Sequence, residues 1–394
     1  MKIAVLQYRL LHYRVELFEL MKARLAKAGL DLVLVHGQAS DTERLRKDEG
    51  ELSWARRVRN RFLRIAGKDI VWQPLPPEAR RAALVVTMQE NRILSNYRLQ
   101  LGRLVGGPRV AYWGHGKNFQ STAPGGLRER WKTFLLNKVD WWFAYTDLTV
   151  AHLEAQGYPS GRITNLENAI DVSGFQRELD SVSEGEIHAI SEQFGLKSQS
   201  RVGLFCGSLY AEKKIGLLLE SADLIRESVP DFHLVVIGDG PSAAEVQAAA
   251  ESRPWIHCMG VRKGHDKAVL FRLAHVQLNP GLVGLHVLDA FAAGLPMVTT
   301  AAALHSPEIA YLRNGINGII TDNDDASSYA RPLIDLLSDE GMRGKMAEQC
   351  RTDAQRYTVE NMARNFCDGI IRCLDSYGLR PGVEPDSAKK ALRE

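Results

Sequence analysis

Residues 279–300 read NPGLVGLHVLDAFAAGLPMVTT, and this stretch decides how the chain is organised. Short apolar runs at 276–278 and 297–300 predict two strands, and 285–293 predicts a helix that Gly294 and Pro296 close. A glycine-containing loop therefore opens onto the N-terminus of a buried helix between two parallel strands. Such a helix end carries unpaired N–H groups and a partial positive charge, which suits a phosphate group.

One carboxylate, Asp289, lies inside this otherwise apolar helix. A buried carboxylate is costly unless another group pairs with it. Ribose hydroxyls would be a suitable partner, and this favours a nucleotide ligand. The alternative is an ordinary β-loop-α turn of a parallel sheet, in which a neighbouring side chain caps Asp289.

The second half of the stretch, LDAFAAGLPMV at 288–298, resembles the donor-binding motif of the family 4 retaining glycosyltransferases. That motif has two glutamates separated by seven residues, then Ala, a small residue, Gly and Pro. Asp289 stands at the second glutamate, which in the family holds the nucleotide ribose, and Gly281 stands at the first, which usually touches the transferred sugar. The resemblance implies further donor contacts from the loop backbone at Leu282, Val283, Gly284 and Leu285.

A second motif follows the strand expected at 202–206. The family pattern is Gly-Arg-Leu with a lysine five residues after the arginine, and Gly207 and Lys213 match it while Ser208 replaces the arginine. The resemblance implies that Lys213, with Lys214 as a second cation, neutralises the donor diphosphate. The alternative is a solvated lysine pair, although cations are unfavourable at a helix N-terminus without an anion.

The resemblance implies the GT-B fold, an α/β architecture of two Rossmann-like parallel-sheet domains facing across a cleft. The donor would bind the second domain and the acceptor the first. We place the domains at 1–175 and 201–360, because the polar and acidic stretch 176–200 is typical of a linker. The remaining residues, 361–394, would form a helix crossing back to the first domain and a flexible tail.

The first loop of the chain is rich in Arg, His and Tyr. It follows a buried strand predicted at 2–7, and open α/β sheets bind ligands at the carboxyl ends of their strands. In the family this loop faces the acceptor. The acceptor-binding candidates are therefore Arg9, His12, Tyr13 and Arg14, and the alternative is a surface loop with solvated arginines.

The segment 54–65 combines five arginines with apolar residues at helical spacing, which are Trp54, Val58, Phe62 and Ile65. This pattern predicts a basic amphipathic helix that could lie on an anionic membrane. The alternative is a helix that packs on its own domain and leaves its basic face in water.

His115 lies between two glycines at the end of a strand predicted at 109–113. Such a histidine can donate or accept a proton near pH 7. The family often places a histidine here, near the donor sugar, so His115 joins Lys213 as a catalytic candidate. The alternative is a loop histidine that holds a backbone carbonyl.

Composition narrows the function classes. A chain of 394 residues suits two domains, and 50 basic against 47 acidic residues give no reason to expect a nucleic-acid partner. Five scattered cysteines indicate a reducing compartment. Without a signal peptide or a long apolar run, we expect a cytoplasmic protein, possibly at the inner face of the membrane. We expect neither a metal nor a cofactor, because no Asp-x-Asp motif follows a strand apart from a surface turn at 322–325.

The resemblance implies a hexosyltransferase that moves a sugar from a nucleotide-sugar to an acceptor hydroxyl with retention of configuration. The donor is a UDP-sugar ahead of a GDP-sugar, and the acceptor a saccharide or lipid-linked saccharide of cell-surface polysaccharide or glycolipid synthesis. Two alternatives remain open. One is a sugar-nucleotide epimerase or hydrolase of the same fold, and the other is a catalytically silent subunit that only binds the nucleotide-sugar.

Overall fold

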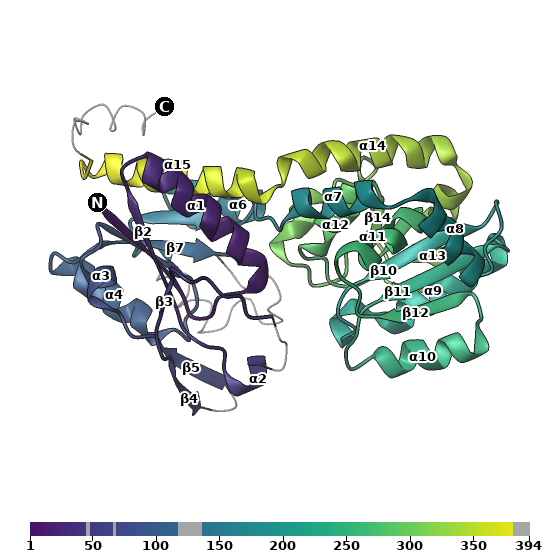
Figure 1. Cartoon of the computed structure of the whole chain (residues 1–394), viewed down its shortest axis with the longest axis horizontal. Helices are drawn as coiled ribbons and strands as arrows, with labels where there is room; N and C mark the ends of the chain where they lie inside the picture. The colour runs from purple at the N-terminus through teal and green to yellow at the C-terminus, as the bar shows by residue number, and fades with distance from the viewer. Residues whose placement is uncertain (45–47, 66–67, 117–135, 381–394) are drawn as a thin grey trace. The chain divides into compact units, whose positions relative to one another are not determined.

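The computed structural model describes residues 1–44, 48–65, 68–116 and 136–380 (Figure 1). The chain divides into two compact units. Unit 1 comprises Met1–Ile170 and Val359–Glu394, and unit 2 comprises Asp171–Thr358. Each is a parallel-sheet α/β unit, so the expected fold class is confirmed at the level of the two units.

Unit 1 is built on a seven-stranded parallel sheet in the order β3-β2-β1-β6-β7-β8-β9. Its central strands are almost continuously apolar, as expected where helices cover both faces of a parallel sheet. Because β1 pairs with β2 on one side and β6 on the other, the winding reverses at β1. The strands are β1 (Lys2–Gln7), β2 (Asp31–His36), β3 (Arg56–Arg57), β6 (Leu84–Met88), β7 (Arg109–Gly114), β8 (Trp141–Ala144) and β9 (Ile163–Asn165).

The C-terminal helix α15 (Val359–Ser376) belongs to unit 1, where it lies beside α1 (Val15–Lys27) (Figure 1). Its apolar face is fully buried, and a side chain at Gly369 would collide with Thr164 and Phe143. The helix therefore packs closely on β8 and β9. The other α-helices in the described part of unit 1 are α2 (Asp41–Arg44), α3 (Pro77–Arg80), α4 (Leu94–Leu104) and α6 (Asp147–Ala155).

The predicted helix at 54–65 is wrong. After β3, the chain forms an antiparallel pair of strands, β4 (Arg61–Ile65) and β5 (Lys68–Trp72) (Figure 1). Side chains alternate between the two faces of a strand, so Phe62 packs with Tyr8, Val71 and Ile93 while its neighbour Leu63 is 59% exposed. The helical spacing of the apolar residues was accidental, and the segment pairs instead with β5.

Unit 2 contains a six-stranded parallel sheet in the order β12-β11-β10-β13-β14-β15. Its core joins Phe205 of β10 and Phe232 of β11 with apolar faces of α9 and α13. The strands are β10 (Arg201–Cys206), β11 (Phe232–Ile237), β12 (Ile256–Gly260), β13 (Val276–Leu278), β14 (Met297–Thr300) and β15 (Gly318–Thr321). The helices that follow α8 are α9 (Ile215–Ser228), α10 (Ala243–Ser252), α11 (Gly264–Leu273), α12 (His286–Ala293), α13 (Ala326–Ser338) and α14 (Glu340–Arg356).

In place of the linker that we expected at 176–200, unit 2 begins with two helices, α7 (Val172–Ser181) and α8 (Glu184–Gln193). α7 buries Val172, Phe175 and Leu179 against α11 and α12, and a capping box starts α8. The segment is mostly polar, so the few apolar residues that bury one face of α7 did not stand out in the sequence. The flexible tail expected at the end of 361–394 lies mainly outside the described residues.

Within the described ranges, none of the helices has both the length and the apolar character that crossing a bilayer requires.

Candidate active site

The carboxyl ends of β10 and β13 bring together the two segments of unit 2 that the sequence singled out. β10 pairs with β11 on one side and β13 on the other, so the winding reverses between β10 and β13. Open α/β sheets bind ligands at the carboxyl ends of strands at such a point. Residues 207–214 follow β10 and residues 279–285 follow β13, so the lysine pair and the glycine loop share one edge of the sheet.

Gly281 is required because another backbone segment passes against it. A Cβ atom at this position would collide with the Glu212 carbonyl oxygen and lie 2.5 Å from the Lys213 Cα atom. The Leu282 N–H donates to the same Glu212 oxygen at 2.8 Å, which holds the two segments together. No side chain fits here, so the absence of the family's glutamate is part of how this loop packs.

Lys213 points into the loop. Its side chain is 3% exposed, and Nζ donates to the Leu282 carbonyl oxygen at 2.5 Å and faces Asn279 Oδ1 at 3.4 Å. Burial lowers the pKa of Lys213 to about 7. A bound anion would offset the cost of burying this charge and restore the proton, so the site is suited to a phosphate.

Asn279 and His286 are site residues that the sequence analysis missed. Asn279 Nδ2 donates to the carbonyl oxygens of Gly281 and Leu282, at 3.0 and 3.3 Å, which turns Oδ1 toward His286 Nε2 at 3.1 Å. His286 Nε2 also lies 3.5 Å from Lys213 Nζ, so the three side chains meet inside the loop. Burial, with the charges of Lys213 and Lys267, holds the pKa of His286 well below its usual value. His286 could have been noticed as the first residue of the helix after the glycine loop.

His305 fixes the middle of the loop. The Val283 N–H donates to His305 Nδ1 at 3.1 Å, and His305 Nε2 donates to the Thr300 carbonyl oxygen at 2.8 Å. The Val283 amide, expected to face a ligand, is thus already used. Among the described residues, the N–H groups of Gly284, Leu285 and His286 have no acceptor, and they form the N-terminus of α12.

Asp289 has a protein partner. Its carboxylate, 9% exposed as a residue, lies 2.8 Å from Lys267 Nζ of α11, and this ammonium lies 4.2 Å from the centre of the Phe175 ring. The structure therefore shows the neighbouring side chain that the alternative interpretation required. The expense of an unpaired buried carboxylate no longer argues for a ribose, and a ribose contact through Asp289 stays a prediction.

The second expected cation is also occupied. Lys214 adopts a left-handed conformation, with φ of 53°, and its Nζ lies 2.5 Å from both carboxylate oxygens of Asp324. Ser208 is exposed, and Gly207 leaves room for the Lys213 side chain, which passes 3.6 Å from the position of a Cβ atom there. Lys213 is thus the cation that the structure directs into the loop.

The arginines of the first loop in unit 1 are buried, so the interpretation as solvated side chains is wrong. Arg14 is 4% exposed and donates to Asn168 Oδ1 at 2.6 Å and to the Ala169 carbonyl oxygen at 3.3 Å. These contacts give Arg14 a structural role. His12 is exposed and Tyr13 half-buried, so an acceptor contact by these two side chains stays a prediction.

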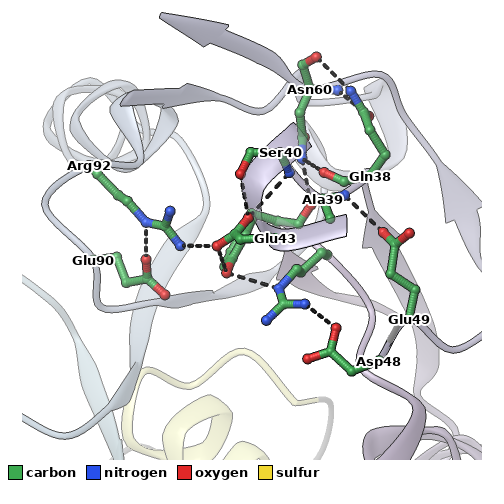
Figure 2. A network of polar contacts seen from close by, with 11 residues as sticks. Gln38, Ala39, Ser40, Glu43, Asp48, Glu49, Asn60, Glu90 and Arg92 are labelled. Atoms are coloured by element: carbon green, nitrogen blue, oxygen red, sulfur yellow. Dashed lines mark hydrogen bonds and ion pairs between the residues drawn. The ribbon is translucent and has the colours of Figure 1, made fainter. Parts of the chain in front are cut away.

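A polar network lies at the carboxyl ends of β1, β2 and β6 in unit 1 (Figure 2). Glu43 is its centre and accepts hydrogen bonds from Tyr8 Oη at 2.9 Å, Ser40 Oγ at 3.1 Å and Arg92 Nη2 at 3.1 Å. Burial acts to raise the pKa of Glu43, but these hydrogen bonds outweigh it and the pKa is lowered. Arg9 joins the network through Tyr8 Oη at 3.1 Å and pairs with Asp48. The partners lie up to 49 positions apart in the chain, so no local motif marked them.

His115 follows β7, and its side chain is exposed. Its ring meets that of Tyr145 edge-on, with centres 4.3 Å apart. The next residue, Gly116, accepts a hydrogen bond from Gln89 Nε2 at 3.3 Å, which ties the loop to the end of β6. Lys117 and Asn118, which complete the sequence motif, lie outside the described residues.

Comparisons with known proteins agree with this geometry. Residues 200–339 match the family model of the glycosyl transferases group 1. The chain is 27% identical over 274 residues to the putative glycosyltransferase EpsD of Bacillus subtilis, covering 65% of this chain and 69% of that protein. It is 22% identical over 211 residues to the alpha-monoglucosyldiacylglycerol synthase of Acholeplasma laidlawii, covering 52% of this chain and about half, 51%, of the synthase.

The crystal structure of Anabaena HepE in complex with UDP superposes with a TM-score of 0.66 at 15% identity, covering 94% of this chain and all of HepE. This likeness identifies the fold as GT-B. Residues 200–339 and the EpsD alignment make the chain similar to the group 1 glycosyltransferases.

Proposed function

We propose that this protein transfers a hexose from a nucleotide-sugar to an acceptor hydroxyl with retention of configuration. The observation that carries the proposal is the loop at 279–286 in unit 2, where the buried Lys213 meets a helix N-terminus with free N–H groups. Both features favour a diphosphate at the edge of the sheet where ligands bind.

The loop would act on the leaving group. As the bond between the sugar C1 and the diphosphate breaks, negative charge grows on the departing oxygen while an acceptor oxygen bonds to C1. The acceptor proton ends on the departing diphosphate. Lys213 and the amides of Gly284 and Leu285 are preorganised donors for that charge, which is the largest contribution that such a site makes. His115 stays the second catalytic candidate.

We propose a UDP-sugar ahead of a GDP-sugar as the donor, with no metal and no cofactor. Solved structures of HepE with UDP and with UDP-glucose support this order. Because Lys213 and the α12 N-terminus can neutralise the diphosphate, activity should persist in EDTA. A thermal-shift panel of UDP-, GDP-, ADP- and dTDP-sugars identifies the nucleobase of the donor. A ligand at 100 times its Kd adds about 2.7 kcal/mol to the free energy of unfolding, so the nucleotide-sugar that binds raises the melting temperature.

Release of the nucleoside diphosphate tests the reaction class. The purified protein is incubated with the stabilising nucleotide-sugar, with and without an acceptor extract. A transferase releases the diphosphate only with acceptor, and NMR of the product shows whether the anomeric configuration is retained. Release without acceptor would instead indicate a hydrolase, a changed sugar an epimerase, and binding without turnover a silent subunit.

We further propose that unit 1 touches the inner face of an anionic membrane and that the acceptor is a saccharide or lipid-linked saccharide of polysaccharide or glycolipid synthesis. Leu63 and Ile65 of β4 are 59% and 51% exposed, and Leu101 and Leu104 of α4 are 66% and 75% exposed. Arg56, Arg57, Arg59 and Arg61 are exposed near β4. Apolar and cationic side chains together favour an anionic interface. The relationship to a glycolipid synthase supports this acceptor class.

Co-sedimentation with phosphatidylglycerol vesicles tests the membrane contact. Leu63→Ser with Ile65→Ser should weaken binding about tenfold, while the control pair Leu148→Ser with Ile316→Ser, on other exposed surfaces, should not. Equal binding of both double variants would contradict this contact and leave the proposed reaction untouched.

A further inference from the structure

Unit 1 contains a cavity of about 980 Å³ between the segment after β2 and the strand β4. We propose that this cavity binds a phosphate group of the acceptor, an inference that rests on the proposed transferase function. The lining includes four arginines and two aspartates, and the arginines are Arg44, Arg59, Arg61 and Arg64.

The charges in the cavity are unbalanced. Arg44 lies 3.6 Å from Asp41 and Arg64 lies 4.0 Å from Asp69, so these pairs are loose. Among the described residues, Arg59 and Arg61 have no carboxylate partner. Two uncompensated guanidinium groups in one concave site repel each other unless an anion lies between them, and planar guanidinium groups match phosphate oxygens bidentately.

The wall of the cavity that carries Arg59 and Arg61 is held rigidly. Gln38 Nε2 donates to the Asn60 carbonyl oxygen at 3.0 Å, and the Asn60 N–H donates back to Gln38 Oε1 at 2.9 Å (Figure 2). Asn60 is 3% exposed, and its Nδ2 also donates to the Gln38 carbonyl oxygen at 3.0 Å. Because Asn60 lies between Arg59 and Arg61, these bonds fix the backbone that carries both unpaired arginines.

The position and shape of the cavity agree with a substrate site. Residues 38–40 directly follow the carboxyl end of β2, beside β1 where the winding of the sheet reverses. Val58, Phe62 and Pro74 add an apolar part to the lining. The volume exceeds that of a phosphate ion, so the geometry points to a larger molecule whose phosphate meets the arginines and whose remainder lies on the apolar part.

Calorimetric titration of the whole chain with inorganic phosphate tests the site, with Lys213→Met present in every protein to remove the proposed anion site of unit 2. Arg59→Gln with Arg61→Gln should lower phosphate affinity at least about tenfold. The control pair Arg80→Gln with Arg81→Gln removes the same charge from exposed positions outside the cavity and should change affinity less than about twofold. The variant Arg59→Lys with Arg61→Lys keeps the positive charge but loses the planar guanidinium groups that bind phosphate bidentately. Its phosphate affinity should lie between those of the glutamine pair and the control pair.

Titration with phosphatidic acid vesicles in place of phosphate separates the sources of the phosphate group. Binding of vesicles that requires Arg59 and Arg61 indicates a lipid headgroup, and binding of free phosphate alone indicates a soluble phosphorylated saccharide. Unchanged phosphate affinity in the glutamine pair, or an equal loss in the control pair, overturns the proposal. UDP-sugar binding is measured in parallel on the chain that keeps Lys213, and its absence there would instead count against the donor site of unit 2.

Discussion

The two proposed anion sites lie at the carboxyl edges of their sheets and differ in chemistry. In unit 2 the cation is Lys213, which is 3% exposed and has a pKa lowered to about 7 by burial. In unit 1 the cations are Arg59 and Arg61, which are exposed, and a guanidinium group is always charged in proteins. A buried lysine is an anion site that must be charged by its ligand, whereas an arginine pair is charged beforehand.

Replacing Lys213 by Met should have the largest effect on this contrast. The variant removes the cation in the unit 2 loop, so UDP-glucose affinity should fall about 100-fold, while phosphate binding in unit 1 stays unchanged. Calorimetric titration measures both, and circular dichroism checks the fold. The control Lys345→Met, at an exposed position on α14, should bind UDP-glucose normally. An unchanged UDP-glucose affinity in Lys213→Met would show that Lys213 is not the cation that binds the donor in unit 2.

The second largest effect is expected for Gly281→Ala, which disturbs the backbone packing that positions Lys213. The new methyl group collides with the backbone at 212–213, so the variant should lose about 1–3 kcal/mol of unfolding free energy in urea. Gly284→Ala is the matched control, because the nearest atom to its Cβ position is 3.8 Å away, and its cost should stay within about 0.5 kcal/mol. Equal stability of the two variants would show that the loop moves freely at Gly281.

The pH dependence of donor binding is the third test. Below pH 7 Lys213 is already protonated and UDP-glucose affinity should be constant. Above pH 7 the free protein must take up a proton on binding, so affinity should fall about tenfold for each pH unit. The stability of the unliganded protein changes in the opposite direction. Because the unfolded state holds this proton up to its ordinary pKa of about 10.4, stability from this group should rise with pH above 7. Titrations from pH 6 to 9 on wild type and Lys213→Met measure both trends, and equal slopes in the two proteins would rule out Lys213 as the titrating group.

The smallest effect is expected in unit 1. Between pH 8 and 9.5 inorganic phosphate keeps its charge and arginine cannot lose its proton, so phosphate affinity should change less than about twofold. Calorimetry over this range, on the Lys213→Met variant to remove the unit 2 site, isolates the cavity. A steep fall would mean that a titrating group other than Arg59 and Arg61 binds the phosphate.

The sequence predicted the features that depend on neighbours in the chain. The loop at 279–285, the helix after it and the strands expected at 2–7, 109–113, 202–206, 276–278 and 297–300 follow from apolar runs and from Gly294 and Pro296 as stop residues. Contacts between distant residues were out of reach. Lys267, which pairs with Asp289, lies on a different helix, and the buried position of Arg14 depends on Asn168, 154 positions away.

Misleading local patterns explain the remaining errors. The apolar residues of 54–65 fit a helix by spacing, but the segment lies at the edge of unit 1 and pairs with β5. The stretch 176–200 is polar enough for a linker, yet a few apolar side chains dock α7 on α11. In both cases the partner element lies outside the window from which the prediction was made.

The assignment of α15 to unit 1 determines the order in which the chain can fold during synthesis. Unit 2 is one continuous segment, Asp171–Thr358, and can close its core as soon as that segment leaves the ribosome. The core of unit 1 needs side chains from α15, including Phe366 and Ile370, so the unit translated first is the last to be completed. Nascent unit 1 therefore lacks the α15 cover on α1, β8 and β9 throughout the translation of unit 2.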